Sequence, residues 1–375
     1  MNVQDDSGKP VRREQDVLLS VQDLRTYFHT RAGIVKAVDG VSFELHTGET
    51  LGIVGESGSG KTVTALSVMR LIPEPPGQIA GGRITFDGRD MLSLSPHELQ
   101  RMRGSVMSMI FQDPMTSLNP VLSIGYQLKE TLKRHQKIVG RQADLRAAEL
   151  LDRVGISAPS KRLKEYPHNF SGGMRQRVVI AMALACNPKL IIADEPTTAL
   201  DVTIQAQILD LLRGLRDDFD TSILLITHDL GVVARLCDRV VVMYGGKVLE
   251  TGTAIETFKH ANQPYTEGLL NSIPRLDRTR GEALTPIPGN PPNMLAPPRG
   301  CPFAPRCSYV LERCIQDMPP LEAVSGSATH FSACWATNSP LPLSASQPAS
   351  DRSGVREGGA SRGARDERSP EELYT

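Results

Sequence analysis

The choice of fold rests on Ser171-Gly172-Gly173-Met174-Arg175-Gln176-Arg177, a Gly-rich stretch that we name the signature element. It follows a phosphate-loop pattern at Gly55-Glu56-Ser57-Gly58-Ser59-Gly60-Lys61-Thr62 and precedes an apolar run that ends in Asp194-Glu195. Many unrelated enzymes carry a phosphate loop, but far fewer carry a second Gly-rich element between that loop and its acidic strand. The order of the three motifs therefore indicates a nucleotide-binding α/β protein with two separate anion-binding elements.

Composition narrows the class of protein. The chain has 375 residues, 40% of them hydrophobic, which suits one large domain or two unequal ones. Lys+Arg and Asp+Glu each total 42, so the net charge is zero, which argues against nucleic acid as a partner. No run of about 18 apolar residues is present to span a membrane, and residues 1–16 lack the apolar core of a secretion signal. The six cysteines are therefore expected in a reducing cytosol, where disulfides are not favoured.

Hydrophobic patterning divides the chain into segments. Residues 1–16 are predicted to be a disordered leader, and residues 17–255 a nucleotide-binding domain. This domain begins with alternating apolar positions as far as Phe43, which predict an antiparallel β region. The buried strand Leu51-Gly52-Ile53-Val54 then leads into the phosphate loop, and a helix is expected from Thr62 to Leu71.

A helical insertion is predicted over about residues 113–170, because residues 126–132 and 145–154 have helical spacing. Apolar runs at 190–193 and 223–226 predict parallel strands, with a helix from Ile204 to Leu215 between them. A hairpin is expected over residues 240–250, because Gly245-Gly246 suits the positive φ angles of a two-residue turn.

The amino-acid composition changes again after residue 255. Residues 256–336 form a Cys/Pro-rich extension, which contains six prolines between Pro286 and Pro298 and the four cysteines Cys301, Cys307, Cys314 and Cys334. Residues 337–375 are dominated by Ser, Gly, Arg, Glu and Pro, and are predicted to be a disordered tail.

The phosphate loop, residues 55–62, fits its pattern at every fixed position. Its small residues let successive backbone N–H groups turn toward phosphates, and the following helix N-terminus adds positive potential. Lys61 is expected to pair with the β- and γ-phosphates and Thr62 to ligate Mg²⁺. The expected ATP contacts in this loop are Gly55, Ser57, Gly58, Ser59, Gly60, Lys61 and Thr62.

An acidic pair follows the apolar run at 190–193. Asp194 ends this predicted strand, so its carboxylate is expected at the sheet's C-terminal edge beside the metal ion. Two acids at a strand end can instead form a solvated turn, but the upstream phosphate loop argues against that alternative.

These motifs make the chain resemble the ATPase subunits of ATP-binding-cassette (ABC) systems. The resemblance implies an α/β phosphate-loop NTPase with a RecA-like core, an antiparallel β subdomain and an α-helical subdomain. It also implies that Glu195 polarises the attacking water, that His228 contacts the γ-phosphate, and that Gln112 senses Mg²⁺ and the water. Asp201 matches the D-loop, which reaches the opposite subunit, and Phe28 or Tyr27 is the candidate for stacking on adenine.

The resemblance gives the signature element a partner on another chain. Ser171 is expected to cap the following helix, and Gly172 and Gly173 to allow close backbone approach to a phosphate. In the family two cassettes pack head to tail, so that each signature closes over the other's phosphate loop. This chain departs from the common Leu-Ser-Gly-Gly-Gln pattern at Phe170 and Met174. The resemblance implies that it supplies two half-sites and requires a second ATPase, a homologous chain.

The four clustered cysteines leave three alternatives open: unligated thiols, a structural zinc site, and an iron–sulfur cluster. Their spacing lacks the CxxC pairs that are typical of zinc sites. The segment Cys301-Pro302-Phe303-Ala304-Pro305-Arg306-Cys307 is similar to the C-terminal extension of peptide-permease ATPases, some of which hold a [4Fe–4S] cluster. Zinc is the least favoured of the three. Cys186 and Cys237 lie in apolar surroundings and are expected to be core thiols.

Residues 113–120, 194–203 and 264–270 also resemble the ATPase subunits of dipeptide and oligopeptide permeases. This resemblance implies ATP hydrolysis coupled to import of short peptides, with two membrane-spanning permease subunits and an extracytoplasmic solute-binding protein as partners. It places the chain as a peripheral protein at the cytoplasmic face of the inner membrane. The alternative is a soluble ABC ATPase of DNA repair or translation, but the second cassette or long coiled coil typical of those proteins is not apparent in the sequence.

Overall fold

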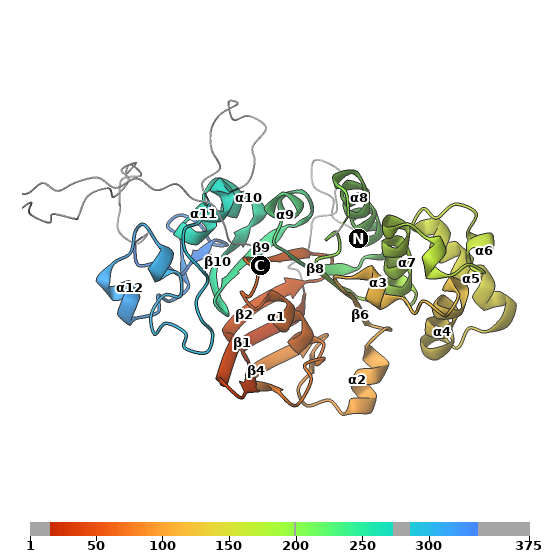
Figure 1. Ribbon diagram of the computed structural model, residues 1–375, viewed down its shortest axis with the longest axis horizontal. Coiled ribbons are helices and arrows are strands. Elements are labelled where there is room, and N and C mark those ends of the chain that lie inside the picture. The colour runs from red at the N-terminus through yellow and green to blue at the C-terminus, as the bar shows by residue number, and fades with distance from the viewer. Residues whose placement is uncertain (1–15, 199, 273–285, 337–375) are drawn as a thin grey trace, which may run out of the picture. The chain divides into compact units, whose positions relative to one another are not determined.

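The computed structural model describes residues 16–198, 200–272 and 286–336, which contain two β-sheets flanked by helices (Figure 1). Most of the predicted leader and the whole predicted tail lie outside the described residues. The mixed sheets and flanking helices are those of an α/β protein, as the sequence predicts.

The smaller sheet is antiparallel, with strand order β2-β1-β4-β5. Strands β1 (Val17–Thr30) and β2 (Gly33–His46) form a long hairpin that confirms the predicted antiparallel β region. Strands β4 (Gly77–Phe86) and β5 (Arg89–Asp90), which complete the sheet, were not predicted. Helix α2 (Pro96–Met102), which begins with a capping box formed by Ser95 and Glu98, follows them.

The larger sheet has the strand order β11-β12-β10-β9-β3-β8-β7-β6. Its parallel part consists of β3 (Thr50–Val54), β6 (Met107–Ile110), β7 (Leu190–Asp194), β8 (Ser222–Thr227) and β9 (Arg239–Tyr244). Every residue of β3, β7 and β8 is buried, which explains why these strands are continuous apolar runs rather than alternating ones. Their carboxyl ends meet at one edge, where the phosphate loop and the acidic pair follow.

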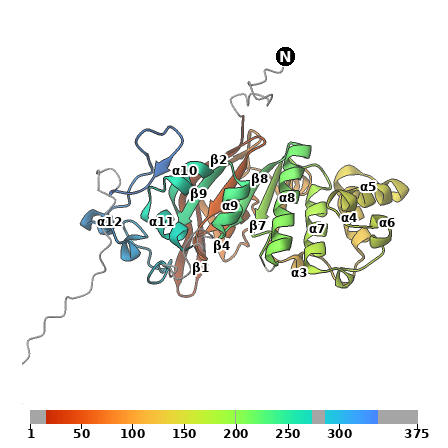
Figure 2. The same ribbon diagram turned by 90° about the horizontal axis from the view of Figure 1, so that it is seen from above.

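Helices flank this sheet and also form a separate group beside α7 (Figure 2). The flanking helices are α1 (Lys61–Val68), α7 (Gly172–Leu184), α8 (Val202–Phe219) and α9 (Leu230–Leu236). The group beside α7 consists of α3 (Pro114–Ser117), α4 (Ile124–Gln136), α5 (Gly140–Arg153) and α6 (Pro159–Arg162). No helix in the described ranges is both long and apolar enough to cross a membrane.

Two predicted boundaries can be compared in detail with the structure. Helix α1 ends at Val68 rather than at Leu71, because Arg70 adopts a left-handed conformation (φ 51°) and Leu71 N donates to Leu66 O at 2.7 Å, as in a Schellman turn. The predicted hairpin is confirmed: β9 pairs with β10 (Lys247–Thr253), and Gly245 and Gly246 both have positive φ.

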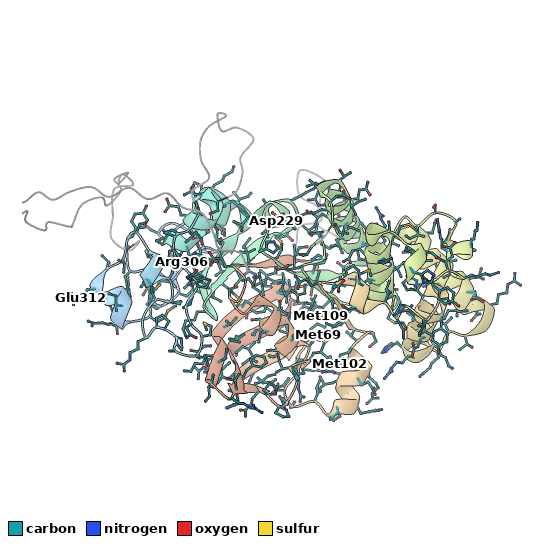
Figure 3. The ribbon with its side chains drawn as sticks, in the orientation of Figure 1. Met69, Met102, Met109, Asp229, Arg306 and Glu312 are labelled. Carbon is teal, nitrogen blue, oxygen red and sulfur yellow. The ribbon has the colours of Figure 1, made fainter. Side chains whose placement is uncertain are left out.

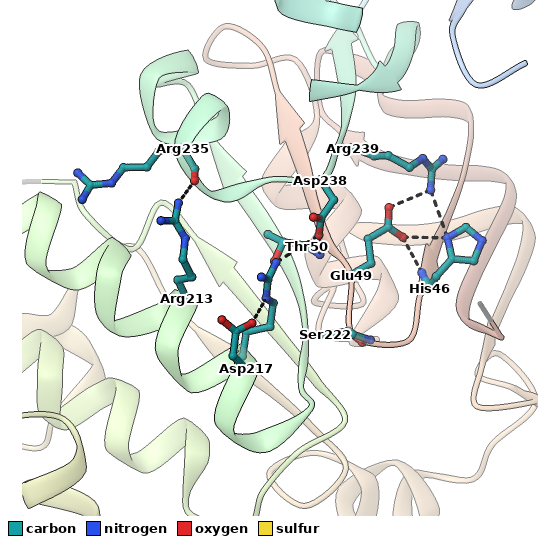
Figure 4. A network of polar contacts seen from close by, with 11 residues as sticks. His46, Glu49, Thr50, Arg213, Asp217, Ser222, Arg235, Asp238 and Arg239 are labelled. Atoms are coloured by element: carbon teal, nitrogen blue, oxygen red, sulfur yellow. Dashed lines mark hydrogen bonds and ion pairs between the residues drawn. The ribbon is translucent and has the colours of Figure 1, made fainter. Parts of the chain in front are cut away.

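A buried polar network lies at the opposite edge of the larger sheet (Figure 4). Glu49, which is 1% exposed, accepts from His46 N at 2.7 Å and from Arg239 Nη1 at 3.2 Å. Asp238 accepts from Thr50 N at 2.9 Å. These bonds fix the amino ends of β3 and β9, and ligands of such sheets bind at the carboxyl ends. The network is therefore structural.

The extension packs onto the sheet through β12 (Phe331–Ser332), which pairs with β10, and β11 (Glu322–Ala323). His330 Nε2 lies 2.7 Å from Glu250 Oε1, and both side chains are almost completely buried. The remaining elements of this region are α10 (Ala254–Lys259), α11 (Pro264–Asn271), the short 3-10 helix Ala304–Arg306 and α12 (Glu312–Gln316).

Candidate functional site

The phosphate loop has a conformation that only glycine allows at two positions. Gly55 has φ 152°, and a Cβ there would lie 2.1 Å from Met243 O. Gly60 has φ 102°, and a Cβ there would lie 2.4 Å from Ala37 O. A strand thus turns sharply into helix α1, whose N-terminal N–H groups point out of the sheet edge.

Lys61 lies inside this loop and is only 6% exposed. Its Nζ donates to Gly55 O at 2.7 Å and to Glu56 O at 2.9 Å. Burial lowers its pKa, while the nearby carboxylates of Glu195 and Asp194 oppose the decrease. The hydroxyl of Ser59 is buried and has no partner among the described residues. The unpaired hydroxyl of Ser59 and the Lys61 ammonium, which is bonded to carbonyl groups of its own loop, both fit a site that binds a chain of phosphates.

Thr62 and Asp194 meet beside Lys61, as the sequence predicted for two metal ligands. Thr62 Oγ1 donates to Asp194 Oδ1 at 3.1 Å. Asp194 is 3% exposed, and burial raises its pKa to about 6. A hydroxyl and a carboxylate are the kind of oxygen ligands that Mg²⁺ prefers in phosphate-binding sites. The donor set therefore fits the metal ion.

Glu195 is the centre of the predicted catalytic set. Its Oε2 accepts from Gln112 Nε2 at 2.9 Å, and its Oε1 lies 3.0 Å from His228 Nδ1. These three residues come from the ends of β7, β6 and β8, which are neighbours in the sheet. The structure thus brings together three side chains that are far apart in the sequence. Glu195 also has φ 47°, a conformation that is rare outside glycine and common at functional sites.

The environment of Glu195 keeps its side chain ionised. Burial would raise its pKa, but hydrogen bonds from His228 and Thr198 outweigh burial and lower it. Thr198 Oγ1 donates to Glu195 Oε2 at 2.9 Å. The sequence analysis missed Thr198, although its position three residues after Glu195 in a turn could have indicated it. A carboxylate held in this way can accept a hydrogen bond from water and orient it.

The signature element forms the start of helix α7 and is not hydrogen-bonded to the phosphate loop within the described residues. Ser171 is the N-cap, as predicted, and its Oγ accepts from Met174 N at 3.4 Å. A Cβ on Gly173 would lie 2.7 Å from Ile204 Cγ2, so that this glycine lets α7 approach α8. Asp201 caps α8 by accepting from Ile204 N at 2.9 Å. In the described part of the chain, no hydrogen bond joins Ser171 to residues 55–62.

Comparison with known proteins identifies the family. The pattern described as "ABC transporter" matches residues 38–198, and that described as "Oligopeptide/dipeptide transporter, C-terminal region" matches residues 249–314. The chain is 55% identical to the oligopeptide transport ATP-binding protein OppD of Bacillus subtilis (strain 168) over 87% of this chain and 90% of that protein. It belongs to the ABC family of oligopeptide and dipeptide transport ATP-binding proteins.

Other members of the family and more distant structures agree. OppD of Escherichia coli (strain K12) is 54% identical over 86% of this chain and 95% of its own. The dipeptide transport ATP-binding protein DppD of Bacillus subtilis (strain 168) is 54% identical over 85% and 94%. Among solved structures, the dimeric ATP-binding cassette MJ0796 bound to ADP and Pi is 26% identical, with a TM-score of 0.57 over 63% of this chain and 98% of that one. The fold is therefore that of an ABC cassette, and the family hydrolyses ATP.

Two aromatic residues were predicted for the adenine site of this family member. Tyr27 is held by the protein: its hydroxyl donates to Asp39 Oδ1 at 2.7 Å, and burial together with Asp39 raises its pKa to about 12. Phe28 is half-buried at the end of β1 and makes no such polar contact. Which of the two rings stacks on a base stays a prediction.

The four cysteines of the extension lie near one another, but not in the arrangement of a metal site. Burial raises the pKa of Cys301 to about 11 and of Cys307 to about 12, and charge on neighbouring cysteines adds to both increases. Cys301 N donates to Cys314 O at 2.8 Å. Nevertheless, within the described residues no three His, Cys, Asp or Glu side chains form a group that could hold a metal ion. The sequence-based suggestion of a cluster therefore remains unsupported. Cys237 is a buried core thiol as predicted, whereas Cys186 is half-buried against the core.

Proposed function

We propose that this chain hydrolyses ATP to energise the import of short peptides through a membrane transporter. The observation that carries the proposal is the convergence of Gln112, Glu195 and His228 beside the Thr62–Asp194 pair, in a chain of this family. The relatives named above are transport proteins, which disfavours the alternative of a soluble ATPase of DNA repair or translation.

Residues around the phosphate loop would bind ATP and Mg²⁺. Lys61 exchanges its two loop carbonyls for phosphate oxygens, and Ser59 gains the partner that its hydroxyl lacks. Thr62, Asp194 and Gln112 are the proposed ligands of Mg²⁺, which would neutralise phosphate charge when bound. Phe28 stacks on the adenine ring.

Glu195 would orient the attacking water while remaining a carboxylate. Gln112 and His228 each lie within hydrogen-bonding distance of a different oxygen of Glu195. These two contacts fix the plane of the carboxylate. His228 is also half-exposed at the strand end, where it can reach the terminal phosphate. Positioning of this kind, with charge stabilisation by Lys61, is the main contribution of proteins to phosphoryl transfer.

The signature element would serve the ATP site of a second cassette. Ser171, Gly172 and Gly173 form the N-terminal end of α7, where N–H groups and the helix dipole favour an anion. No hydrogen bond joins this element to residues 55–62 in the described part of the chain, which supports a phosphate supplied by another ATPase chain; we propose that this chain is homologous. Asp201, at the start of α8, lies beside this interface.

A groove between the core and the helical group would receive the permease. The groove of ≈ 610 Å³ is lined by Met69, Met109, Phe111, Thr131 and Met182, among others. Figure 3 labels Met69 and Met109, which both line this groove. Phe111 is 43% exposed and directly precedes Gln112, which binds Glu195. A cytoplasmic helix of a permease subunit seated here would therefore act one residue from the catalytic set.

Docking of a permease subunit in this groove implies the other transporter subunits and the cellular location of the chain. Two permease subunits would each take one cassette, and an extracytoplasmic binding protein would deliver the peptide to them. The chain is then a peripheral protein at the cytoplasmic face of the inner membrane. We place the nucleotide-binding domain at residues 17–255, with its helical part at about 113–170, and the extension at 256–336.

A finer proposal concerns Cys301, Cys307, Cys314 and Cys334. Burial and the neighbouring cysteines raise the pKa of the Cys301 and Cys307 thiols. The four thiols are suitable donors for a [4Fe–4S] cluster, although their side chains would have to turn toward a common point. Anaerobic purification provides the test. Iron and a visible absorbance band that are lost in the Cys301→Ser variant support the cluster, and a colourless, iron-free protein refutes it.

Hydrolysis by the assembled transporter tests the main proposal. Glu195→Gln keeps the size of the side chain but removes its charge and replaces one accepting oxygen with an amide donor, so ATP turnover should fall by about 100-fold or more while ATP binding persists. Glu130→Gln, an exposed glutamate on α4, is the matched control and should leave turnover unchanged. Near-normal turnover in Glu195→Gln would refute the assignment of the catalytic carboxylate.

A further inference from the structure

Arg306, in the Cys/Pro-rich extension, reaches the phosphate loop. It ends the short helix Ala304–Arg306 between two of the four cysteines, and its side chain is 6% exposed. Its Nη1 donates to Glu56 Oε2 at 2.7 Å, and its Nη2 donates to Glu56 Oε1 at 3.1 Å. This is the two-pronged geometry in which a guanidinium holds a carboxylate most firmly. Figure 3 labels Arg306 beside the sheet.

The other N–H groups of Arg306 are also used. Nη1 donates to Tyr244 Oη at 3.0 Å, Nη2 to Ile287 O at 3.2 Å, and Nε to Pro288 O at 2.8 Å. The guanidinium therefore makes five hydrogen bonds, its full donor capacity. Because two chain segments and Glu56 converge on it, the guanidinium has a single position.

Glu56 is held by its backbone as well. Its N–H donates to Tyr265 Oη at 2.7 Å, and Tyr265 is fully buried. The ring of Tyr265 packs on Tyr244 and Phe303 with centroid distances of 4.6 and 5.3 Å. Phe303 belongs to the same short stretch of the extension as Arg306. The extension thus fixes both the side chain and the backbone of one phosphate-loop residue.

The carbonyl group of Glu56 connects this contact to the ATP site. This carbonyl is one of the two acceptors that hold Lys61, at 2.9 Å from Nζ. The loop residue that the extension fixes is therefore the one that sets where the phosphate-binding ammonium lies. A structural contact with no role at the site would not need to end on this residue, and a nearly buried ion pair carries a desolvation cost that favours a specific purpose.

We propose that Arg306 is a positioning residue of the ATP site, acting through Glu56 on the phosphate loop and Lys61. The ATP site of this chain is then incomplete without its C-terminal extension. The inference rests on the proposed assignment of residues 55–62 as the phosphate loop.

ATP affinity and turnover of the full-length chain test this proposal. Arg306→Ala should weaken ATP binding about tenfold, equivalent to about 1.4 kcal/mol, and should lower turnover in the assembled transporter. Arg306→Lys should restore part of the loss, because it keeps the charge but not the two-pronged geometry. The matched control is Arg299→Ala, since Arg299 is exposed in the same extension and makes no hydrogen bond with a described residue.

A double-mutant cycle separates positioning from general stability. If Arg306 acts through Glu56, the losses of ATP affinity in Arg306→Ala and Glu56→Gln should not add in the double variant. Melting temperatures report folding separately, and Arg306→Lys and Glu56→Gln keep the test valid if Arg306→Ala does not fold. Normal ATP affinity in Arg306→Ala with a lowered melting temperature, or additive losses in the cycle, would overturn the proposal. Lys61→Ala tests the phosphate-loop assignment separately from the role of Arg306. Retained ATP binding in that variant refutes the phosphate-loop assignment itself.

Discussion

Asp194→Asn should stabilise the nucleotide-free protein while abolishing its Mg²⁺-dependent activity. The carboxyl group of Asp194 is 3% exposed, and burial raises its pKa from 3.8 to about 6. At neutral pH the folded chain therefore carries a buried carboxylate that would be more stable in water. An asparagine has nearly the same shape, and its amide oxygen can still accept the hydrogen bond from Thr62 Oγ1.

The size of the effect follows from the pKa of Asp194. A change from 3.8 to about 6 corresponds to about 3 kcal/mol, at about 1.4 kcal/mol for each tenfold change in proton affinity. Because the folded-state pKa is the higher one, ionisation favours the unfolded chain. The cost is absent below about pH 4, grows between about pH 4 and pH 6, and is complete above that range. The gain from the substitution should follow the same profile.

Thermal and urea unfolding of the chain in a chelating buffer, from pH 4 to pH 8, would measure this difference. The matched control is Asp201→Asn, because Asp201 is an exposed N-cap and asparagine caps helices equally well. Hydrolysis by the assembled transporter should be lost in Asp194→Asn, which gives the combination of gained stability and lost activity expected of a functional residue. A destabilised variant at pH 8, or a difference that does not change with pH, would refute the reasoning.

Three further predictions concern stability and assembly. Glu49→Ala should lower the free energy of unfolding by about 1–3 kcal/mol, because it leaves His46 N–H and the Arg239 guanidinium without their acceptor. ATP affinity measured by fluorescence titration should not change. Gly214→Ala should raise the free energy of unfolding by about 1 kcal/mol through helix propensity, because a Cβ there meets nothing within 4 Å. Gly52→Ala should lower it, because a Cβ there would lie 2.9 Å from Cys237 Sγ. Urea unfolding measures both differences. Ser171→Ala should leave ATP binding by the separate chain unchanged but reduce turnover of the paired cassettes; equal loss in both assays would place its phosphate on the same chain.

Local patterns predicted the parts of the fold that depend on local chemistry. The phosphate loop, the glycine pair of the β9–β10 hairpin and the cap at Ser171 each require particular residue types at fixed spacing, and the structure has all three. The buried strands β7 and β8 were recognised because parallel strands covered on both faces are continuously apolar. The acidic pair and His228 could then be expected at the sheet edge where these strands end.

Contacts between distant segments could not be predicted in the same way. Arg306 and Glu56 are 250 positions apart, and neither residue departs from the patterns of its own segment. Strand β4 was missed because its exposed and buried positions alternate imperfectly in a Gly-rich stretch, and β5 because it consists of only two residues, both exposed. The end of α1 was placed too late because an arginine, not a glycine, adopts the left-handed conformation that closes it.

The central claim is that ATP hydrolysis at Glu195 drives peptide import. The most direct measurement is simultaneous ATP hydrolysis and uptake of a labelled short peptide in vesicles that contain the assembled transporter. With Glu195→Gln in this chain, both rates should fall together, and Glu130→Gln should leave both unchanged. Peptide uptake that continues at its normal rate while hydrolysis by the variant is lost would contradict the account.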